Sequence, residues 1–225
     1  TEKVKFNEGD QWLTNVKTKT IMYNPLDLIN QPFLVSKGLL LHELSHVQYT
    51  YPKTETELEK KHPVMQLVYN VFEDYRIEYK TLQEYGDYAR EALSMVNEMG
   101  LINGEQEFAK GKIGKQSKLI QFLNHSMAYS IPNRYYLNYS YTENSRARTD
   151  QDVLEKTKLL YDMYSQIQEL RTTDDLKTFI DKNIYPIIKE YIKNEPEHKQ
   201  QQLQVGCNKS ASGIKENGRI EARRS

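Results

Sequence analysis

The stretch His42-Glu43-Leu44-Ser45-His46 decides how the rest of the chain is interpreted. Apolar residues recur at helical spacing through Ser36–Tyr49, SKGLLLHELSHVQY, and predict a buried helix with Ser36 as its N-cap. Helical positions four apart lie on one face, so His42 and His46 can share one metal ion. Glu43 then lies beside that ion, where its carboxylate can accept a proton from a metal-bound water. The alternative is a pair of core histidines satisfied by hydrogen bonds alone.

The HExxH spacing is the signature of zinc peptidases, whose zinc has a third protein ligand and one open position. The following segment offers two candidates for that ligand. His62 precedes Pro63 in a charged linker and is expected to be exposed. Glu73 lies on a second predicted helix, from Pro63 to about Tyr85, with an apolar stripe on its core-facing side. This helix can pack antiparallel to the first, so Glu73 is the better candidate.

The stretch Asn70–Glu78, NVFEDYRIE, resembles the N-x-x-E-D-x-R-I-E signature that follows HExxH in a group of bacterial and phage metallopeptidase domains. Domains of this group are often fused to, or encoded beside, von Willebrand factor A domains, and a related pattern occurs in the large subunit family of cobalt chelatases. The resemblance spans roughly Thr20 to Glu78. It implies a glutamate-type zincin with Glu73 as the third zinc ligand. The chain departs from the broad zinc-peptidase pattern at Gln48, where an apolar residue is expected.

The neighbours of Glu73 are candidates for the surroundings of the ion. Asp74 is predicted to hold the N–H group of a ligand histidine, as an outer carboxylate does in many such sites. Arg76 is predicted to orient Glu73 or to polarise a substrate carbonyl. The alternative for both residues is an ordinary solvated helix face. Asn70 is expected on the same face as Glu73.

Two further candidates lie much later in the chain. His125 is expected near the end of a helix from about Lys115 to Tyr129, where it can contact substrate or stabilise an oxyanion. The alternative is a histidine that only interacts with the helix dipole. The tyrosine-rich loop Arg134–Tyr141 offers hydroxyl groups, that of Tyr136 among them, which can stabilise an oxyanion or contact a protein partner.

The expected fold is mainly helical (α+β): a zincin-like helical metallopeptidase core with a small N-terminal β element. Lys19–Pro25 is predicted to form a strand with Lys3–Phe6 as its partner. An extended substrate can pair with such a strand, or the element is a hairpin that only caps the helices. Further helical patterns are predicted at about 87–100, 105–111, 115–129, 150–171, 174–182 and 184–193, with turns at Gly100–Gly104 and Ser130–Asn133.

Composition narrows the class of protein. The chain has 225 residues with 31 Lys and Arg against 31 Asp and Glu, so no basic field indicates a nucleic-acid partner. The single cysteine, Cys207, cannot form an internal disulfide. No apolar run has the length of a membrane span and no signal sequence opens the chain, so a cytoplasmic protein without a membrane partner is expected. Residues 1–193 are predicted to form the metallopeptidase-like domain, and 194–225 a flexible polar tail or linker.

These patterns predict zinc-dependent hydrolysis of a peptide or protein substrate, with Glu43 as general base. The main alternative, implied by the resemblance, is a non-catalytic, metal-stabilised adaptor or assembly module that works with an AAA+ ATPase or a von Willebrand factor A domain protein. A third alternative is a protein that keeps this fold and binds a partner through its tyrosine-rich loop.

Overall fold

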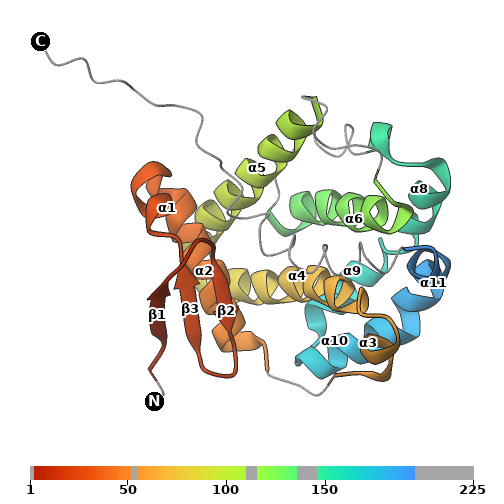
Figure 1. The fold of residues 1–225 in the computed structure, drawn as a ribbon, viewed down its shortest axis with the longest axis horizontal. Coiled ribbons are helices and arrows are strands. Elements are labelled where there is room, and N and C mark those ends of the chain that lie inside the picture. Colours follow the sequence, from red (N-terminus) through yellow and green to blue (C-terminus); the bar gives the residue numbers. More distant parts are fainter. Residues whose placement is uncertain (1–2, 52–54, 110–115, 136–145, 196–225) are drawn as a thin grey trace, which may run out of the picture.

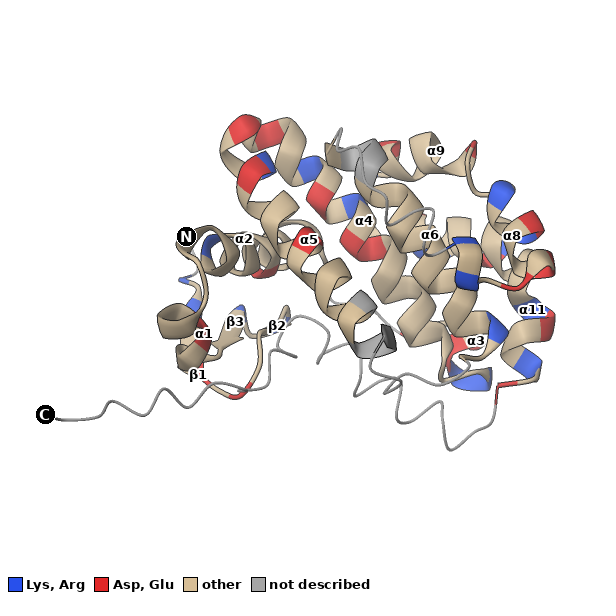
Figure 2. Cartoon of the chain, turned by 90° about the horizontal axis from the view of Figure 1, so that it is seen from above, with Lys and Arg blue, Asp and Glu red and all other residues tan. Residues whose placement is uncertain are grey.

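The structure, a computed structural model, describes residues 3–51, 55–109, 116–135 and 146–195 (Figure 1). It is mainly helical with a small N-terminal mixed sheet, which confirms the predicted fold class. Acidic and basic residues are interspersed along the helices (Figure 2). Within the described ranges, no helix is both long and apolar enough to cross a membrane. Beyond Glu195, the predicted tail lies outside the described residues.

The elements follow one another in the order sheet, helix pair, long central helices and C-terminal helices. They are β1 (Lys5–Glu8), β2 (Leu13–Asn15), β3 (Thr20–Tyr23), α1 (Pro25–Asn30), α2 (Phe33–Tyr49), α3 (Glu57–Lys61), α4 (Met65–Tyr85), α5 (Asp87–Ala109), α6 (Lys118–Tyr135), α8 (Gln151–Lys158), α9 (Met163–Glu169), α10 (Thr173–Phe179), the π-helical turn η1 (Ile180–Ile184) and α11 (Tyr185–Lys193).

The sheet lies against α2. Strand β3 is central, parallel to β1 and antiparallel to β2. The predicted strand and its partner are confirmed as β3 and β1, whereas the three-residue strand β2 was not predicted. Ile21 of β3 is completely buried and packs with Trp12, Val35 and Leu39. This apolar cluster fixes the sheet on the N-terminal half of α2.

Helix α2 begins at Phe33, so the prediction that Ser36 caps it is wrong. Pro32 occupies the N-cap position instead, and the Ser36 hydroxyl lies inside the helix, where it donates to the carbonyl oxygen of Asp27 at 3.1 Å. That bond ties α1 to α2. The helix ends with Thr50 as its C-cap, close to the predicted end.

Helix α4 runs through the middle of the molecule, with the sheet and α2 on one side and the C-terminal helices on the other (Figure 1). Its apolar stripe is buried, as the sequence predicts, and packs against α6, α9 and α10. The buried stripe consists of Val64, Leu67, Val68, Val71, Phe72 and Tyr75. Because this stripe fixes the rotation of α4 about its axis, it also decides which polar residues face α2.

Three predicted boundaries are wrong. The expected turns at Gly100–Gly104 and Ser130–Asn133 lie inside α5 and α6, respectively. Leu101 packs on an apolar cluster in which Ile131 and Tyr135 are buried, so tertiary burial outweighs the local helix breakers. The expected helix at 150–171 is divided into α8 and α9 by a turn after Lys158.

Gly38 allows α2 to approach α5 closely. A Cβ atom at this position would lie 2.2 Å from the carbonyl oxygen of Ala92 and 2.5 Å from Cγ2 of Val96. Backbone atoms cannot yield cheaply, so we expect Gly38→Ala to lower the free energy of unfolding by at least about 1–3 kcal/mol in urea denaturation. Gly100→Ala is the matched control, because its Cβ meets nothing within 4 Å. Equal stability of Gly38→Ala and wild type would contradict this close packing.

Candidate metal centre

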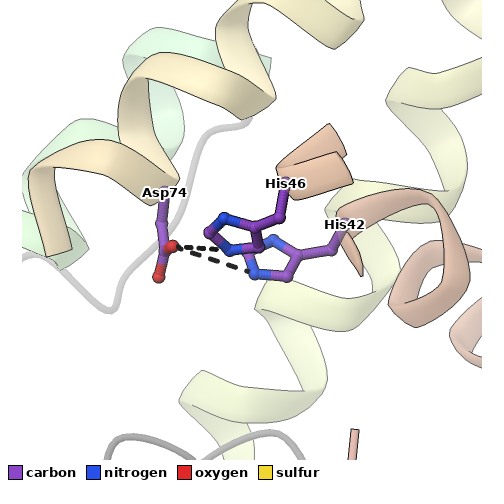
Figure 3. Close-up of side chains that lie close together, drawn as sticks. All are labelled: His42, His46 and Asp74. Atoms are coloured by element: carbon purple, nitrogen blue, oxygen red, sulfur yellow. Dashed lines mark ion pairs between the residues drawn. The ribbon is translucent and has the colours of Figure 1, made fainter. Parts of the chain in front are cut away.

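Two imidazoles and one carboxylate converge between α2 and α4 (Figure 3). Oδ1 of Asp74 lies 3.2 Å from Nε2 of His46 and 3.9 Å from Nε2 of His42. One ligand atom from each residue lies within 4.8 Å of the others, and no other group of three or more His, Cys, Asp or Glu residues in the described part of the chain meets this criterion. The histidine side chains are 20% exposed and that of Asp74 is 41% exposed, so the group is open to solvent.

The other ring nitrogen of each histidine has its own partner. Nδ1 of His42 lies 2.7 Å from Oε1 of Glu78. Nδ1 of His46 lies 3.1 Å from Oγ1 of Thr50. An ionised carboxylate only accepts hydrogen bonds, so Nδ1 of His42 carries a proton that it donates to Glu78. Both rings therefore direct Nε2 toward Asp74, while Nδ1 contacts Glu78 in His42 and Thr50 in His46.

Negative charge dominates the surroundings of His42. Burial opposes protonation of its ring, but the hydrogen bond to Glu78 and the charges of Asp74, Glu78 and Glu43 outweigh burial and raise the pKa of His42 to about 10. In the metal-free chain an imidazolium thus balances these carboxylates. A bound cation would take over that role and would have to displace the Nε2 proton.

Glu43 is buried and contacts the sheet. Its Oε2 atom accepts a hydrogen bond of 2.7 Å from the hydroxyl of Thr14, which also lies 3.0 Å from the carbonyl oxygen of Glu43. Thr14 belongs to β2, so this edge strand contacts α2 at Glu43, whereas β3 packs on the N-terminal half of α2 through Ile21.

Glu73 does not join the group that the structure brings together. Its Oε2 atom accepts from Nε of Arg76 at 2.7 Å, and Oε1 accepts from Nη2 of Arg76 at 2.7 Å and from the hydroxyls of Thr50 and Thr173, both at 2.8 Å. Consecutive helical residues point about 100° apart. When Asp74 faces the histidines, Glu73 therefore faces the end of α2 and the start of α10.

The structure places Asp74 and Arg76, the neighbours of Glu73 on α4, in different surroundings. The Asp74 carboxylate faces Nε2 of both histidines, whereas Glu78 takes the predicted outer position behind His42. Arg76 is completely buried and donates to both carboxylate oxygens of Glu73. Its burial leaves no access to a substrate carbonyl. Asn70 accepts a hydrogen bond from Gln66 and is not part of the group formed by His42, His46 and Asp74.

The remaining candidates lie elsewhere. His125 is buried in the middle of α6, not near its end, and does not belong to the group. Burial and the charge of Arg146 lower the pKa of His125. Tyr136 lies outside the described residues. Gln48 is exposed and donates to Glu84 of α4 at 2.8 Å, which explains a polar residue where an apolar one was expected.

Sequence reasoning missed two partners of the histidines, Thr50 and Glu78. The available signal was spacing: Thr50 follows His46 by one helical turn, and Glu78 follows Asp74 by one turn. A third missed residue, Tyr135, is buried at the end of α6, and its hydroxyl donates to Oε2 of Glu78. Glu78 is thereby anchored from the side opposite His42.

Comparison of the chain with protein-family models, with curated proteins and with solved structures finds no significant match. The function therefore has to be inferred from the geometry of the site.

Proposed function

We propose that the chain is a zinc-dependent peptide hydrolase in which His42, His46 and Asp74 hold the ion and Glu43 is the general base. The observation that carries this proposal is that Nε2 atoms of both histidines face one carboxylate oxygen, while each Nδ1 atom is held by another group. Two imidazole nitrogens and one carboxylate oxygen form a donor set that zinc accepts, with one position left open.

The spacing and the electrostatics fit a divalent cation. Ligand atoms around a tetrahedral zinc ion lie about 3.3 Å apart, given zinc–ligand distances of roughly 2.0–2.1 Å. The separation of 3.2 Å between His46 Nε2 and Asp74 Oδ1 agrees with this value, and His42 Nε2 is only slightly farther away, at 3.9 Å. The field that raises the pKa of His42 attracts a cation for the same reason.

A bound zinc ion would polarise a substrate carbonyl and bring the pKa of a water molecule toward neutrality. Glu43 supplies the proton transfer: its carboxylate accepts a proton from the attacking water and delivers it to the leaving amine. Thr14 holds Oε2, so Oε1 is the atom that we assign to the proton.

The resemblance of the Asn70–Glu78 stretch to metallopeptidase domains supports the peptide bond as the target. The geometry favours Asp74 over Glu73 as the third ligand, because Glu73 already accepts from three side chains. Exposure of the His42, His46 and Asp74 side chains supports an open position for substrate.

Glu43→Gln separates metal binding from catalysis. The amide keeps the shape of the side chain but is no longer an effective base, so we expect about one zinc per chain and a loss of roughly 10²–10⁴-fold in hydrolysis of a quenched fluorescent peptide library. Metal content is measured by mass spectrometry on the same samples. Full activity in the variant would remove Glu43 from the mechanism.

A hydroxamate inhibitor tests for the open coordination position. We expect it to bind the zinc-loaded chain and to compete with peptide hydrolysis, because a catalytic zinc site keeps one exchangeable position. Glu43→Gln is the matched control, since it retains the ion and should still bind the hydroxamate. Zinc binding without hydroxamate binding or hydrolysis would indicate the metal-stabilised adaptor instead.

A further inference from the structure

Thr50 connects the proposed ligand His46 with the buried ion pair of Glu73 and Arg76. It is the C-cap residue of α2, and its hydroxyl oxygen lies 3.1 Å from Nδ1 of His46 and 2.8 Å from Oε1 of Glu73. The only other hydroxyl that donates to Glu73 among the described residues is that of Thr173, 100 positions away along the chain.

The direction of these hydrogen bonds follows from proton counting. Glu73 is paired with Arg76 and, as a carboxylate, only accepts hydrogen bonds, so the single hydroxyl proton of Thr50 is donated to it. The Thr50 oxygen is then left as an acceptor toward His46. Nδ1 of His46 must therefore carry a proton, which makes Nε2, 3.2 Å from Oδ1 of Asp74, the ring nitrogen that can bind an ion.

The ion pair behind Thr50 is rigidly held. The Arg76 side chain is completely buried, and its Nη2 and Nη1 atoms also donate to the carbonyl oxygens of Tyr49 at 2.8 Å and Arg171 at 3.2 Å. These bonds join α4 to the end of α2 and to the segment before α10. Glu73 thus offers Thr50 a fixed acceptor, and its orientation does not depend on solvent.

We infer that Thr50 is a positioning residue for His46: it fixes the Nδ1–H tautomer and the ring orientation through the buried Glu73–Arg76 pair. This inference rests on the proposed role of His46 as a metal ligand. It gives Glu73 a function different from the one that the sequence resemblance implies. Glu73 acts on the metal site through Thr50 and does not bind the ion itself.

Zinc affinity of the full chain provides the first test. Thr50→Val replaces the hydroxyl by a methyl group, and we expect zinc to bind about 10–100-fold more weakly in competition with a fluorescent chelator, as when other outer partners of ligand histidines are lost. Thr50→Ser restores the hydroxyl and should restore affinity. Wild-type affinity in Thr50→Val would overturn the inference.

Thr81→Val is the matched control for the loss of a threonine hydroxyl between α2 and α4. Thr81 is buried, its hydroxyl oxygen lies 2.5 Å from that of Ser45 and donates to the carbonyl oxygen of Ile77 at 2.9 Å, and it forms no hydrogen bond with either histidine. We expect unchanged zinc affinity in this variant. An equal loss in Thr81→Val and Thr50→Val would assign the effect to helix packing and overturn the positioning role.

The tautomer of His46 is a second readout that requires no metal. Two-bond ¹H–¹⁵N correlation spectra of the metal-free chain should show a proton on Nδ1 of His46 in wild type and Thr50→Ser, and a shift toward the form protonated only on Nε2 in Thr50→Val. An identical tautomer in all three proteins would overturn the inference. If wild type shows the Nδ1–H form but binds no metal, the proposed function fails while the positioning by Thr50 stands.

Discussion

An Asp74→Asn variant is expected to bind zinc more than about 100-fold more weakly than wild type, beyond the usual cost of losing an outer partner. Asparagine keeps the shape of the side chain but removes the charge that faces Nε2 of His42 and of His46. The Asp74 side chain is 41% exposed, so we expect the metal-free fold to change by less than about 1 kcal/mol. Metal content after dialysis and a chelator competition assay measure the loss.

Glu84→Gln is the matched control for Asp74→Asn. Glu84 is also on α4, and its carboxylate accepts a hydrogen bond from Gln48 of α2 without contacting the histidines. The same change in charge is expected to leave zinc affinity unaltered. Wild-type affinity in Asp74→Asn, combined with a loss of the ion in Glu73→Gln, would instead make Glu73 the third ligand.

Glu73→Gln is expected to lower the free energy of unfolding by about 3–5 kcal/mol, because it leaves the Arg76 charge buried without its partner. For a domain of this size, that change corresponds to a decrease of roughly 6–20 °C in the melting temperature. Thermal unfolding of the metal-free chain, followed by circular dichroism, isolates this effect from any effect on zinc binding.

The double variant Glu73→Gln/Arg76→Met is the control for the ion pair. It removes the buried charge as well as its partner, and we expect it to recover part of the stability lost in Glu73→Gln. A single variant as stable as wild type would show that water reaches Arg76. A double variant less stable than Glu73→Gln would assign the main role of Arg76 to its bonds with the carbonyl oxygens of Tyr49 and Arg171.

Sequence periodicity predicted the helices well wherever a helix buries a single apolar side in the core. The pattern from Pro63 to Tyr85 predicted α4 almost to the residue, because its apolar side is buried from Met65 to Leu82. Local breakers misled where tertiary contacts are strong, as at Pro132, which lies in α6 next to the buried Ile131. Strand β2 is too short, at three residues, to show an alternating pattern.

Only part of the candidate site could be predicted from the sequence, and the reason is geometric. The pair His42 and His46 depends on spacing within one helix, which a sequence displays directly. The choice between Glu73 and Asp74 depends on how α4 is rotated against α2, and this rotation is fixed by contacts with helices far along the chain. The side chains of the adjacent residues Glu73 and Asp74 thus face different parts of the molecule.

The hydrogen bond between Thr173 and Glu73 has a consequence for the order of folding. It joins residues 100 positions apart, and closing so long a loop costs chain entropy before the contact is gained. Contacts of large sequence separation generally form slowly. Under the proposed function, tight zinc binding should therefore develop late, after α10 has docked on α4. A chain still being synthesised would carry both histidines well before the proposed site is complete.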